Sequence, residues 1–219
     1  MKKKLFYLIT ILFVALGLGF SIMQLVRGNM RAGMLGLLTP LFMFIPLIIN
    51  KLLGAKPYLL YIQGFLYAII AFDIGYVAQM YAVIPHWDKI AHLYSGFLFT
   101  ILGYCLFLLA RRKNAHPEGL PKYIGPCFAL GFSCFIAVFW EVCEFVDFHV
   151  TGNDGQQHLT TGVFDTMYDL ILCLAGSVVC VVSVLLYLYR GWKLPSGAIA
   201  GEFLDIAKSK GGGADKEES

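Results

Sequence analysis

Six long apolar stretches cover most of this 219-residue chain, and each is near or above the length of about 20 residues with which an α-helix crosses a hydrocarbon core. Hydrophobic residues make up 58% of the chain and charged residues 14%, whereas about 25% is typical of a soluble domain, so the chain cannot form an ordinary aqueous surface. We therefore predict an all-α polytopic membrane protein, a bundle of six transmembrane helices. The predicted spans are residues 5–26, 33–50, 58–84, 90–110, 123–149 and 163–189.

The two ends of the chain differ in character. Residues 5–26 are expected to be an uncleaved first span, because the run is too long for a secretory signal and no A-x-A cleavage site follows it. We expect residues 1–194 to form the transmembrane domain and residues 195–219 to form a cytoplasmic tail, partly disordered because its end is Gly-rich and charged. A short amphipathic helix around residues 202–207 fits within this tail.

The second apolar stretch has two interpretations. Pro40 and Pro46 kink or interrupt a helix, so residues 33–50 form either a full span or a re-entrant segment. The choice matters, because a segment that did not cross would change the orientation of every later span.

Lys and Arg residues are distributed unequally between the two sides of the predicted bundle. With the N-terminus in the cytoplasm, the outer segments hold only Arg27, Arg31 and Lys89. The inner segments hold Lys2, Lys3, Lys4, Lys51, Lys56, Arg111, Arg112, Lys113, Lys122, Arg190 and Lys193. The positive-inside rule therefore predicts that both termini are cytoplasmic. The chain shows no aromatic-rich basic domain of the kind that binds nucleic acid.

Acidic side chains lie inside the predicted spans or at their mouths. They are Asp73, Glu141, Glu144, Asp147, Asp165 and Asp169. A charged side chain at the centre of a bilayer costs about 2.5–3.5 kcal/mol on insertion scales, so such residues are candidates for function. Basic partners on the same side are few, namely Lys89, His92, His149 and His158. A bound cation, or protonation of some carboxyls, has to balance the remaining charge.

Polar residues at helical spacing gather at the extracytoplasmic ends of the last three predicted spans. The pairs Asp88/His92 and Asp165/Asp169 are four residues apart, and Glu141/Glu144 are three apart, so each pair shares a helical face. Carboxylates with an imidazole suit a divalent metal such as Zn, Mn or Mg. We predict Asp88, His92, Glu144 and Asp169 as metal ligands, with Glu141 or Asp165 as general base. The alternative for each acid is a protonated side chain that hydrogen-bonds a neighbouring helix.

Two further regions are candidates at this site. The loop of residues 151–162 contains the turn signal Asn-Asp-Gly and then Gln156, Gln157 and His158, which form either a lid that contacts a polar substrate or an ordinary polar connector. Asp73 lies near mid-membrane on the third predicted span, where it could continue a pathway inward or bond to a neighbouring helix.

The positions of the cysteines in the sequence argue against a disulfide framework or a thiolate metal site. All six lie within predicted spans and no CxxC pair occurs, so we expect small apolar side chains and no disulfide framework. Gly96, by contrast, is expected to let a neighbouring helix approach the fourth span closely.

The order of these motifs resembles the YjdF-like family of bacterial inner-membrane proteins, and more distantly the VanZ-like proteins. The motifs are Asp-Lys-x-x-His-x-x-x-Gly from Asp88, Trp-Glu-x-x-Glu-Phe from Trp140, Gly-Gln-Gln from Gly155 and Asp-Thr-x-x-Asp from Asp165, with Gly176 beyond. The resemblance covers roughly residues 85–180, and it places the family's motif on Asp88, His92, Glu141, Glu144, Gln156, Asp165 and Asp169. The loop before Asp165 departs from the family's Gly-Thr-Gln-Gly-Asp pattern and is longer. The resemblance implies a plasma-membrane location and a polar site, and it implies no particular reaction.

Two functional classes remain at this point. In the first, a divalent metal at the extracytoplasmic site hydrolyses or transfers a lipid-linked or small amphiphilic substrate that enters from the bilayer. In the second, the same carboxylates form a cation or proton site in a transporter or in a membrane-stress accessory protein without catalysis. Apart from Ser133, the inner halves of the last three spans are almost wholly apolar, which favours a one-sided site.

Overall fold

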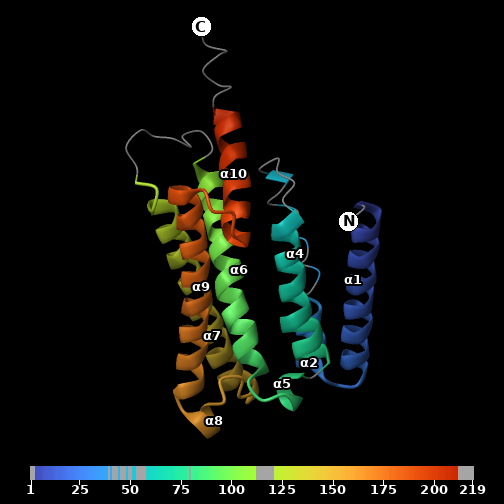
Figure 1. The fold of residues 1–219 in the computed structure, drawn as a ribbon. Helices are drawn as coiled ribbons and strands as arrows, with labels where there is room; N and C mark the ends of the chain where they lie inside the picture. Colours follow the sequence, from blue (N-terminus) through green and yellow to red (C-terminus); the bar gives the residue numbers. More distant parts are fainter. Residues whose placement is uncertain are drawn as a thin grey trace. The chain divides into compact units, whose positions relative to one another are not determined.

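The structure is a computed structural model that describes residues 3–38, 40, 44, 48, 51–52, 58–78, 80–111 and 121–211. Most of these residues are helical, the rest lie in turns and connecting segments, and no strand occurs among them, which confirms the all-α prediction (Figure 1). Contact clustering divides the chain into unit 1, Met1–Asn50 with Tyr58–Ala91, and unit 2, Lys51–Pro57 with His92–Ser219. Each unit is described by itself.

Three helices are long and apolar enough to cross a membrane within the described part of the chain. They are α6 (Trp87–Ala110), α7 (Ile124–Thr151) and α9 (Phe164–Arg190). The predicted spans 90–110, 123–149 and 163–189 fall on these helices, so the apolar runs located them well. A count of six spans is not confirmed by these helices alone.

Unit 1 begins with a helical hairpin of α1 (Lys3–Val26) and α2 (Met30–Gly36). Gly28 makes the turn with a positive φ of 82°, and the Asn29 side chain accepts a hydrogen bond from the Ala32 amide at 3.3 Å to start α2. Gly33 lies against the Leu25 side chain, which a Cβ would meet. Most of the predicted span 33–50 lies outside the described residues, so its crossing stays a prediction.

The predicted span 58–84 differs from a continuous α-helix. It consists of α4 (Tyr58–Tyr67), the π-helix η1 (Ala68–Val77) and the short α5 (Met80–Val83). The Trp87 Nε1–H donates to the Ile70 carbonyl of the π-helix at 3.1 Å. The length of an apolar run indicates the length of a span but not whether its backbone hydrogen bonds are of the α or the π type. Hydropathy therefore could not predict the π-helix. Asp73 lies in η1, and its side chain is outside the described residues, so its role on a pathway stays a prediction.

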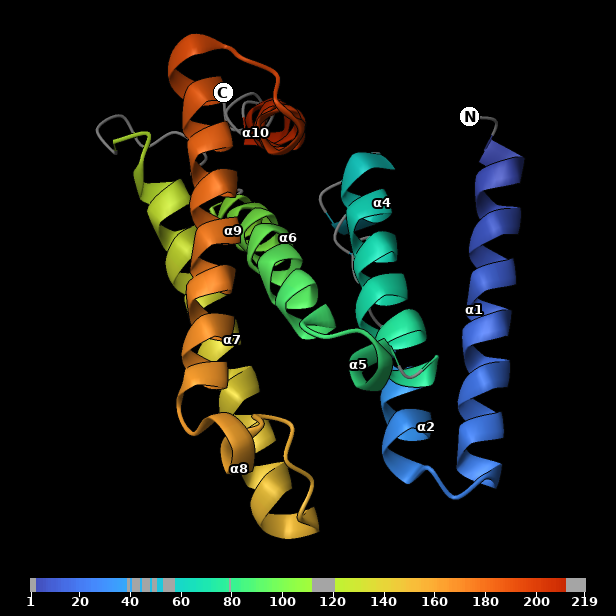
Figure 2. The same ribbon diagram turned by 60° about the horizontal axis from the view of Figure 1, so that its bottom comes forward.

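In unit 2, α6, α7 and α9 alternate in direction along the chain, and α7 packs on α9 (Figure 2). Left-handed glycines end two of these helices, Gly152 with φ 76° after α7 and Gly191 with φ 72° after α9. Helices α6 and α9 approach closely at Gly96 and Gly176. A Cβ at Gly96 would meet the Cys173 backbone, and one at Gly176 would meet the Leu93 carbonyl. The prediction for Gly96 is therefore confirmed.

Buried hydroxyl groups join the three helices of unit 2 just beyond this crossing. The hydroxyls of Thr100, Ser133 and Ser177 donate to the Gly96 carbonyl at 2.8, 3.1 and 3.1 Å. Ser177 Oγ also lies 2.9 Å from Ser133 Oγ and 2.8 Å from the Cys173 carbonyl oxygen, so its single hydroxyl proton has three alternative acceptors, the Gly96 carbonyl among them. These bonds satisfy polar groups that would otherwise be costly in an apolar interior.

The C-terminal helix α10 (Pro195–Gly211) is longer than the short helix expected at residues 202–207. It folds back on α9, where the Gly197 amide donates to Ser183 Oγ at 3.1 Å and Phe203 is fully buried. The sequence could not show this packing, because α10 contains too few apolar residues to resemble a span. Residues 212–219, for which disorder is predicted, lie outside the described residues.

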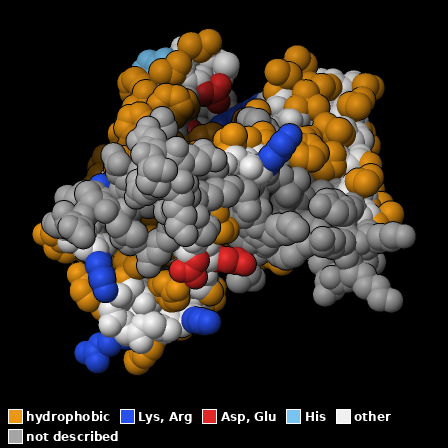
Figure 3. All heavy atoms as spheres, turned by 90° about the horizontal axis from the view of Figure 1, so that it is seen from above, with side chains coloured by type: hydrophobic (Ala, Val, Ile, Leu, Met, Phe, Trp, Pro, Cys, Tyr) orange, Lys and Arg blue, Asp and Glu red, His pale blue; other side chains and the backbone are white. Residues whose placement is uncertain are grey.

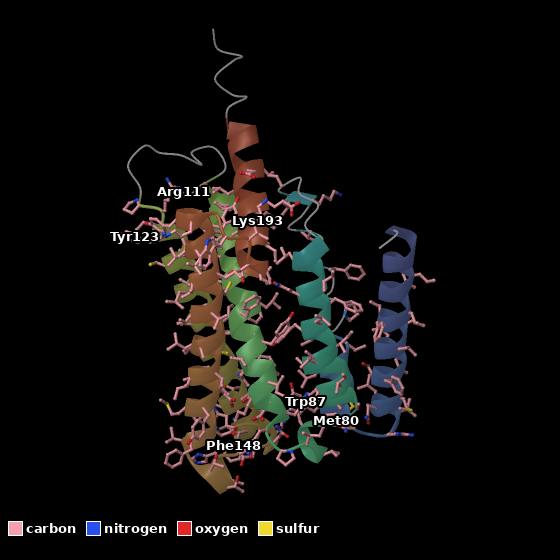
Figure 4. The ribbon with its side chains drawn as sticks, in the orientation of Figure 1. Met80, Trp87, Arg111, Tyr123, Phe148 and Lys193 are labelled. Atoms are coloured by element: carbon pink, nitrogen blue, oxygen red, sulfur yellow. The ribbon has the colours of Figure 1, made fainter. Side chains whose placement is uncertain are left out.

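Basic residues collect at one end of unit 2. Arg111 follows α6, Lys122 precedes α7, and Arg190 and Lys193 lie at the end of α9. Figure 4 shows Arg111, Tyr123 and Lys193 at this end and Phe148 at the other. Figure 3 looks onto this end, where Lys and Arg side chains (blue) and some Asp and Glu side chains (red) are visible beside hydrophobic ones (orange). Lys122 donates to the Leu188 carbonyl at 3.2 Å, so it caps α9.

Candidate metal centre

The candidate site lies at the end of unit 2 opposite to these basic residues. His92 lies near the start of α6, Glu141 lies in the second half of α7, and Asp169 lies in the second turn of α9. Because α7 runs in the opposite direction to α6 and α9, its end meets their beginnings. The predicted convergence of three helix ends therefore holds for these residues.

One ligand atom from each of His92, Glu141 and Asp169 lies within 4.8 Å of the others. His92 Nε2 and Asp169 Oδ1 are 3.8 Å apart, which is too long for a hydrogen bond. Two ligand atoms that each lie about 2.1 Å from one zinc ion are separated by at most about 4.2 Å. The observed spacing thus suits a shared cation after small side-chain movements. Glu141 is 5% exposed and Asp169 is 2% exposed, so a cation here would be largely shielded from water.

The other face of His92 is held by Cys173, which lies one turn after Asp169 on α9. Cys173 Sγ is 3.8 Å from His92 Nδ1 and donates to the His92 carbonyl at 3.2 Å. Ser95 Oγ lies 3.1 Å from the same sulfur and donates to the His92 carbonyl at 2.8 Å. The sequence predicts Cys173 as a small apolar side chain, whereas in the structure its thiol contacts His92. The sequence does contain a pattern that indicates this contact, since Cys173 is four residues beyond Asp169 and therefore shares its helical face.

Glu141 is held by the loop that follows its own helix. Gln156 Nε2 lies 3.1 Å from both Glu141 Oε2 and the Glu141 carbonyl oxygen. Gln157 makes a similar bond to a second acid, because its Nε2 donates to Asp165 Oδ1 at 3.2 Å. Two of the three predicted lid residues, Gln156 and Gln157, therefore contact acidic residues directly.

His158, the third predicted lid residue, is exposed at the start of the short helix α8 (His158–Thr161). Its ring lies edge-on to Phe148, with centroids 6.1 Å apart. The Asp154 carboxylate accepts hydrogen bonds from the His158 and Leu159 amides at 2.7 and 2.9 Å, which caps α8. The loop is thus an ordered structure with its own capping residue.

Glu144, a predicted ligand, lies outside the group of ligand atoms formed by His92, Glu141 and Asp169, and its role as a ligand stays a prediction. It is buried, and its Oε1 accepts a hydrogen bond from Trp140 Nε1 at 3.1 Å, while Glu141 contributes the atom near His92 and Asp169. Glu141 and Glu144 are three residues apart on similar faces of α7, so the sequence pattern could not distinguish them.

The remaining acidic candidates have local contacts. Asp88 lies in the first turn of α6 and belongs to unit 1, where its carboxylate is 3.0 Å from Lys89 Nζ. Asp147 accepts hydrogen bonds from Thr151 Oγ1 at 3.0 Å and from Asn153 Nδ2 at 3.1 Å, near the end of α7. Cysteines form no disulfide in the described part of the chain, as predicted.

Comparisons with known proteins identify a family but no reaction. A family model described as "Predicted membrane protein (DUF2238)" matches residues 5–190, and the YjdF-like resemblance is consistent with this match. An "Uncharacterized protein" of Thermotoga maritima is 32% identical over 103 residues, which cover 47% of this chain and 50% of that protein. The chain thus spans about half the length of this relative. No solved structure matches.

Proposed function

The chain belongs to the DUF2238 family of predicted membrane proteins, and on that premise we propose that it binds a divalent metal at the extracytoplasmic end of its membrane domain. The proposed ligands are His92, Glu141 and Asp169. The observation that carries the proposal is the approach of their ligand atoms to within 4.8 Å from three separate helices. Asp88 is a fourth proposed ligand on its register alone, because it lies one helical turn before His92.

The donor set favours Zn²⁺ or Mn²⁺ over Mg²⁺. An imidazole suits Zn²⁺ and other borderline metals, whereas Mg²⁺ prefers oxygen ligands and retains several water molecules. Carboxylates outnumber the imidazole in this buried site, since Glu141, Asp165 and Asp169 are all at most 5% exposed. A dication would balance this charge, which makes the burial of these residues tolerable.

A metal held by His92, Glu141 and Asp169 alone would keep an open position for water, as in hydrolytic zinc sites, where the metal lowers the pKa of bound water. With Asp88 as a fourth ligand, water could bind only if the metal became five-coordinate. Asp165 would serve as general base, because it lies one turn before Asp169 on the same face of α9. We propose hydrolysis or transfer of a lipid-linked or small amphiphilic substrate, since such a molecule reaches the site from the bilayer.

The proposed membrane arrangement has six spans in the bacterial inner membrane and both termini in the cytoplasm. Support comes from the basic residues at the end of unit 2 opposite to the site, including Arg111, Lys122 and Arg190, because the positive-inside rule places that end in the cytoplasm.

Transport of a cation or proton is the alternative. The contacts beneath the site favour a one-sided centre instead, because the hydroxyls of Thr100, Ser133 and Ser177 all bond the Gly96 carbonyl there. These three side chains are buried, and no charged side chain is among them, so they provide no carboxylate that would continue a cation pathway from the site.

The test is elemental analysis of protein purified in detergent after exposure to Zn²⁺ or Mn²⁺. We expect about one metal ion per chain in the wild type, and loss of that metal in His92→Ala and Asp169→Asn, because three ligands are needed for a stable site. Asp147→Asn is the matched control and should retain the metal, since its carboxylate bonds Thr151 and Asn153 instead. Folded wild type without metal would contradict the proposal and favour protonated carboxyls.

A further inference from the structure

Gln156 returns from the loop after α7 to contact a residue fifteen positions earlier on that helix. Its Nε2 lies 3.1 Å from the Glu141 carbonyl oxygen and 3.1 Å from Glu141 Oε2. A primary amide carries two N–H donors, so one Gln156 side chain can serve both acceptors. These two contacts fix the Glu141 carboxylate relative to its own backbone.

Residues before and after Gln156 in the loop make hydrogen bonds that order this segment. Asp154 caps α8 through the His158 and Leu159 amides. Gln157 has a positive φ of 50°, in the left-handed region that a non-glycine residue adopts at a local cost. This turn directs the Gln157 side chain to Asp165 and the Gln156 side chain to Glu141, two adjacent residues bonded to acids on different helices.

An amide suits the carboxylate of a metal ligand better, as a hydrogen-bond donor, than a basic side chain would. A Lys or Arg at this position would also donate to Glu141, but it would neutralise the carboxylate and repel a dication. A glutamine donates hydrogen bonds without formal charge. It orients the carboxylate and leaves its full negative charge for the metal.

We propose that Gln156 is a positioning residue of the metal centre, which holds Oε2 of Glu141 so that the other carboxylate oxygen meets a divalent metal shared with His92 and Asp169. This inference rests on the proposed metal site. Hydrogen-bond partners of metal ligands typically change affinity by 10–100-fold when they are removed. Gln156 thus acts through Glu141 rather than on the metal or the substrate.

The test is a titration of the full chain in detergent with Zn²⁺ and, separately, Mn²⁺. Gln156→Met keeps the length of the side chain but removes its donors, and we expect the Kd to rise about 10–100-fold. Gln156→Asn keeps the amide on a shorter stem and should show a smaller loss. Gln156→Lys keeps N–H donors but adds a positive charge, and it should abolish binding.

The control for loop structure is Asn153→Ala, which removes another amide-to-carboxylate bond of the same loop, from Asn153 Nδ2 to Asp147 Oδ2. It should retain the wild-type Kd. A wild-type Kd in Gln156→Met would overturn this inference and leave the metal site intact, whereas absence of metal binding by the wild type would overturn both. The melting temperatures of the metal-free wild type and of metal-free Gln156→Met are measured as well. If the variant is destabilised enough to explain its higher Kd, the inference is also overturned, because Gln156 would then stabilise the fold rather than position Glu141.

Discussion

At the scale of residues, four polar side chains at intervals of four along α9 each meet a different partner. Asp165 accepts from Gln157, Asp169 faces His92, Cys173 contacts the His92 carbonyl, and Ser177 bonds Ser133 and Gly96. The stripe changes from carboxylates through a thiol to a hydroxyl as it passes deeper into the bundle. Because the cost of burying a group falls from charge to neutral dipole, this order places the strongest charge nearest the helix end.

Asp154→Ala tests whether the loop over the site depends on its capping residue. Loss of the carboxylate removes the acceptors of the His158 and Leu159 amides and should cost about 0.5–2 kcal/mol of local stability, the range for N-cap residues. We expect faster hydrogen exchange at these two amides, measured by mass spectrometry or NMR. Asp154→Asn keeps one acceptor oxygen and should show a smaller effect. Unchanged exchange in Asp154→Ala would show that other contacts order the loop.

At the scale of elements, the crossing of α6 and α9 depends on the absence of side chains at Gly96 and Gly176. A Cβ at Gly96 would lie 2.7 Å from the Cys173 carbonyl carbon and 2.8 Å from its Cα, and backbone atoms cannot move aside without separating the helices. This close approach brings His92 of α6 to Asp169 and Cys173 of α9. The crossing therefore sets the geometry of the candidate metal centre.

Gly96→Ala should consequently destabilise the protein by about 1–3 kcal/mol or more, the cost of overpacking a well-packed interior. It should also weaken metal binding, because the two helices would separate beside the site. Gly131→Ala is the matched control, since no atom lies within 4 Å of a Cβ there, and it should be neutral or slightly stabilising. Thermal unfolding in detergent measures both. Equal melting temperatures for the two variants would mean that the helices do not cross this closely.

Sequence reasoning located some elements and residues well and others poorly, for physical reasons. Apolar runs placed α6, α7 and α9 closely, because a span must bury its backbone in about 20 apolar residues. Spacing placed the acidic residues at the ends of three spans, but it could not show that Glu141 rather than Glu144 approaches His92 and Asp169, because that depends on how α7 is rotated against its neighbours. In the structure Glu144 instead accepts a hydrogen bond from Trp140. The π-helix η1 was missed because hydrogen-bond register leaves no mark in hydropathy.

At the scale of the whole molecule, the distribution of charge relates the site to the membrane. Within unit 2, Arg111, Lys122, Arg190 and Lys193 follow or precede helix ends at one side. Figure 4 shows Arg111 and Lys193 at this side and Phe148 of α7 at the other, the side where α6 and α9 begin and the acidic residues of the centre lie. The positive-inside rule predicts that the basic side faces the cytoplasm. A metal centre on the opposite side would take its ion and substrate from the extracytoplasmic space or the outer leaflet.

Cysteine labelling of intact bacterial cells tests this orientation. In a variant without the six native cysteines, Leu159→Cys at the site end and Tyr123→Cys at the basic end introduce single thiols at positions that are 74% and 48% exposed. A membrane-impermeant maleimide should label Leu159→Cys in intact cells and Tyr123→Cys only after permeabilisation, because a charged reagent does not cross the bilayer. Labelling of both after permeabilisation is the control. The reverse pattern in intact cells would place the metal centre in the cytoplasm, where a lipid-linked substrate would have to come from the inner leaflet.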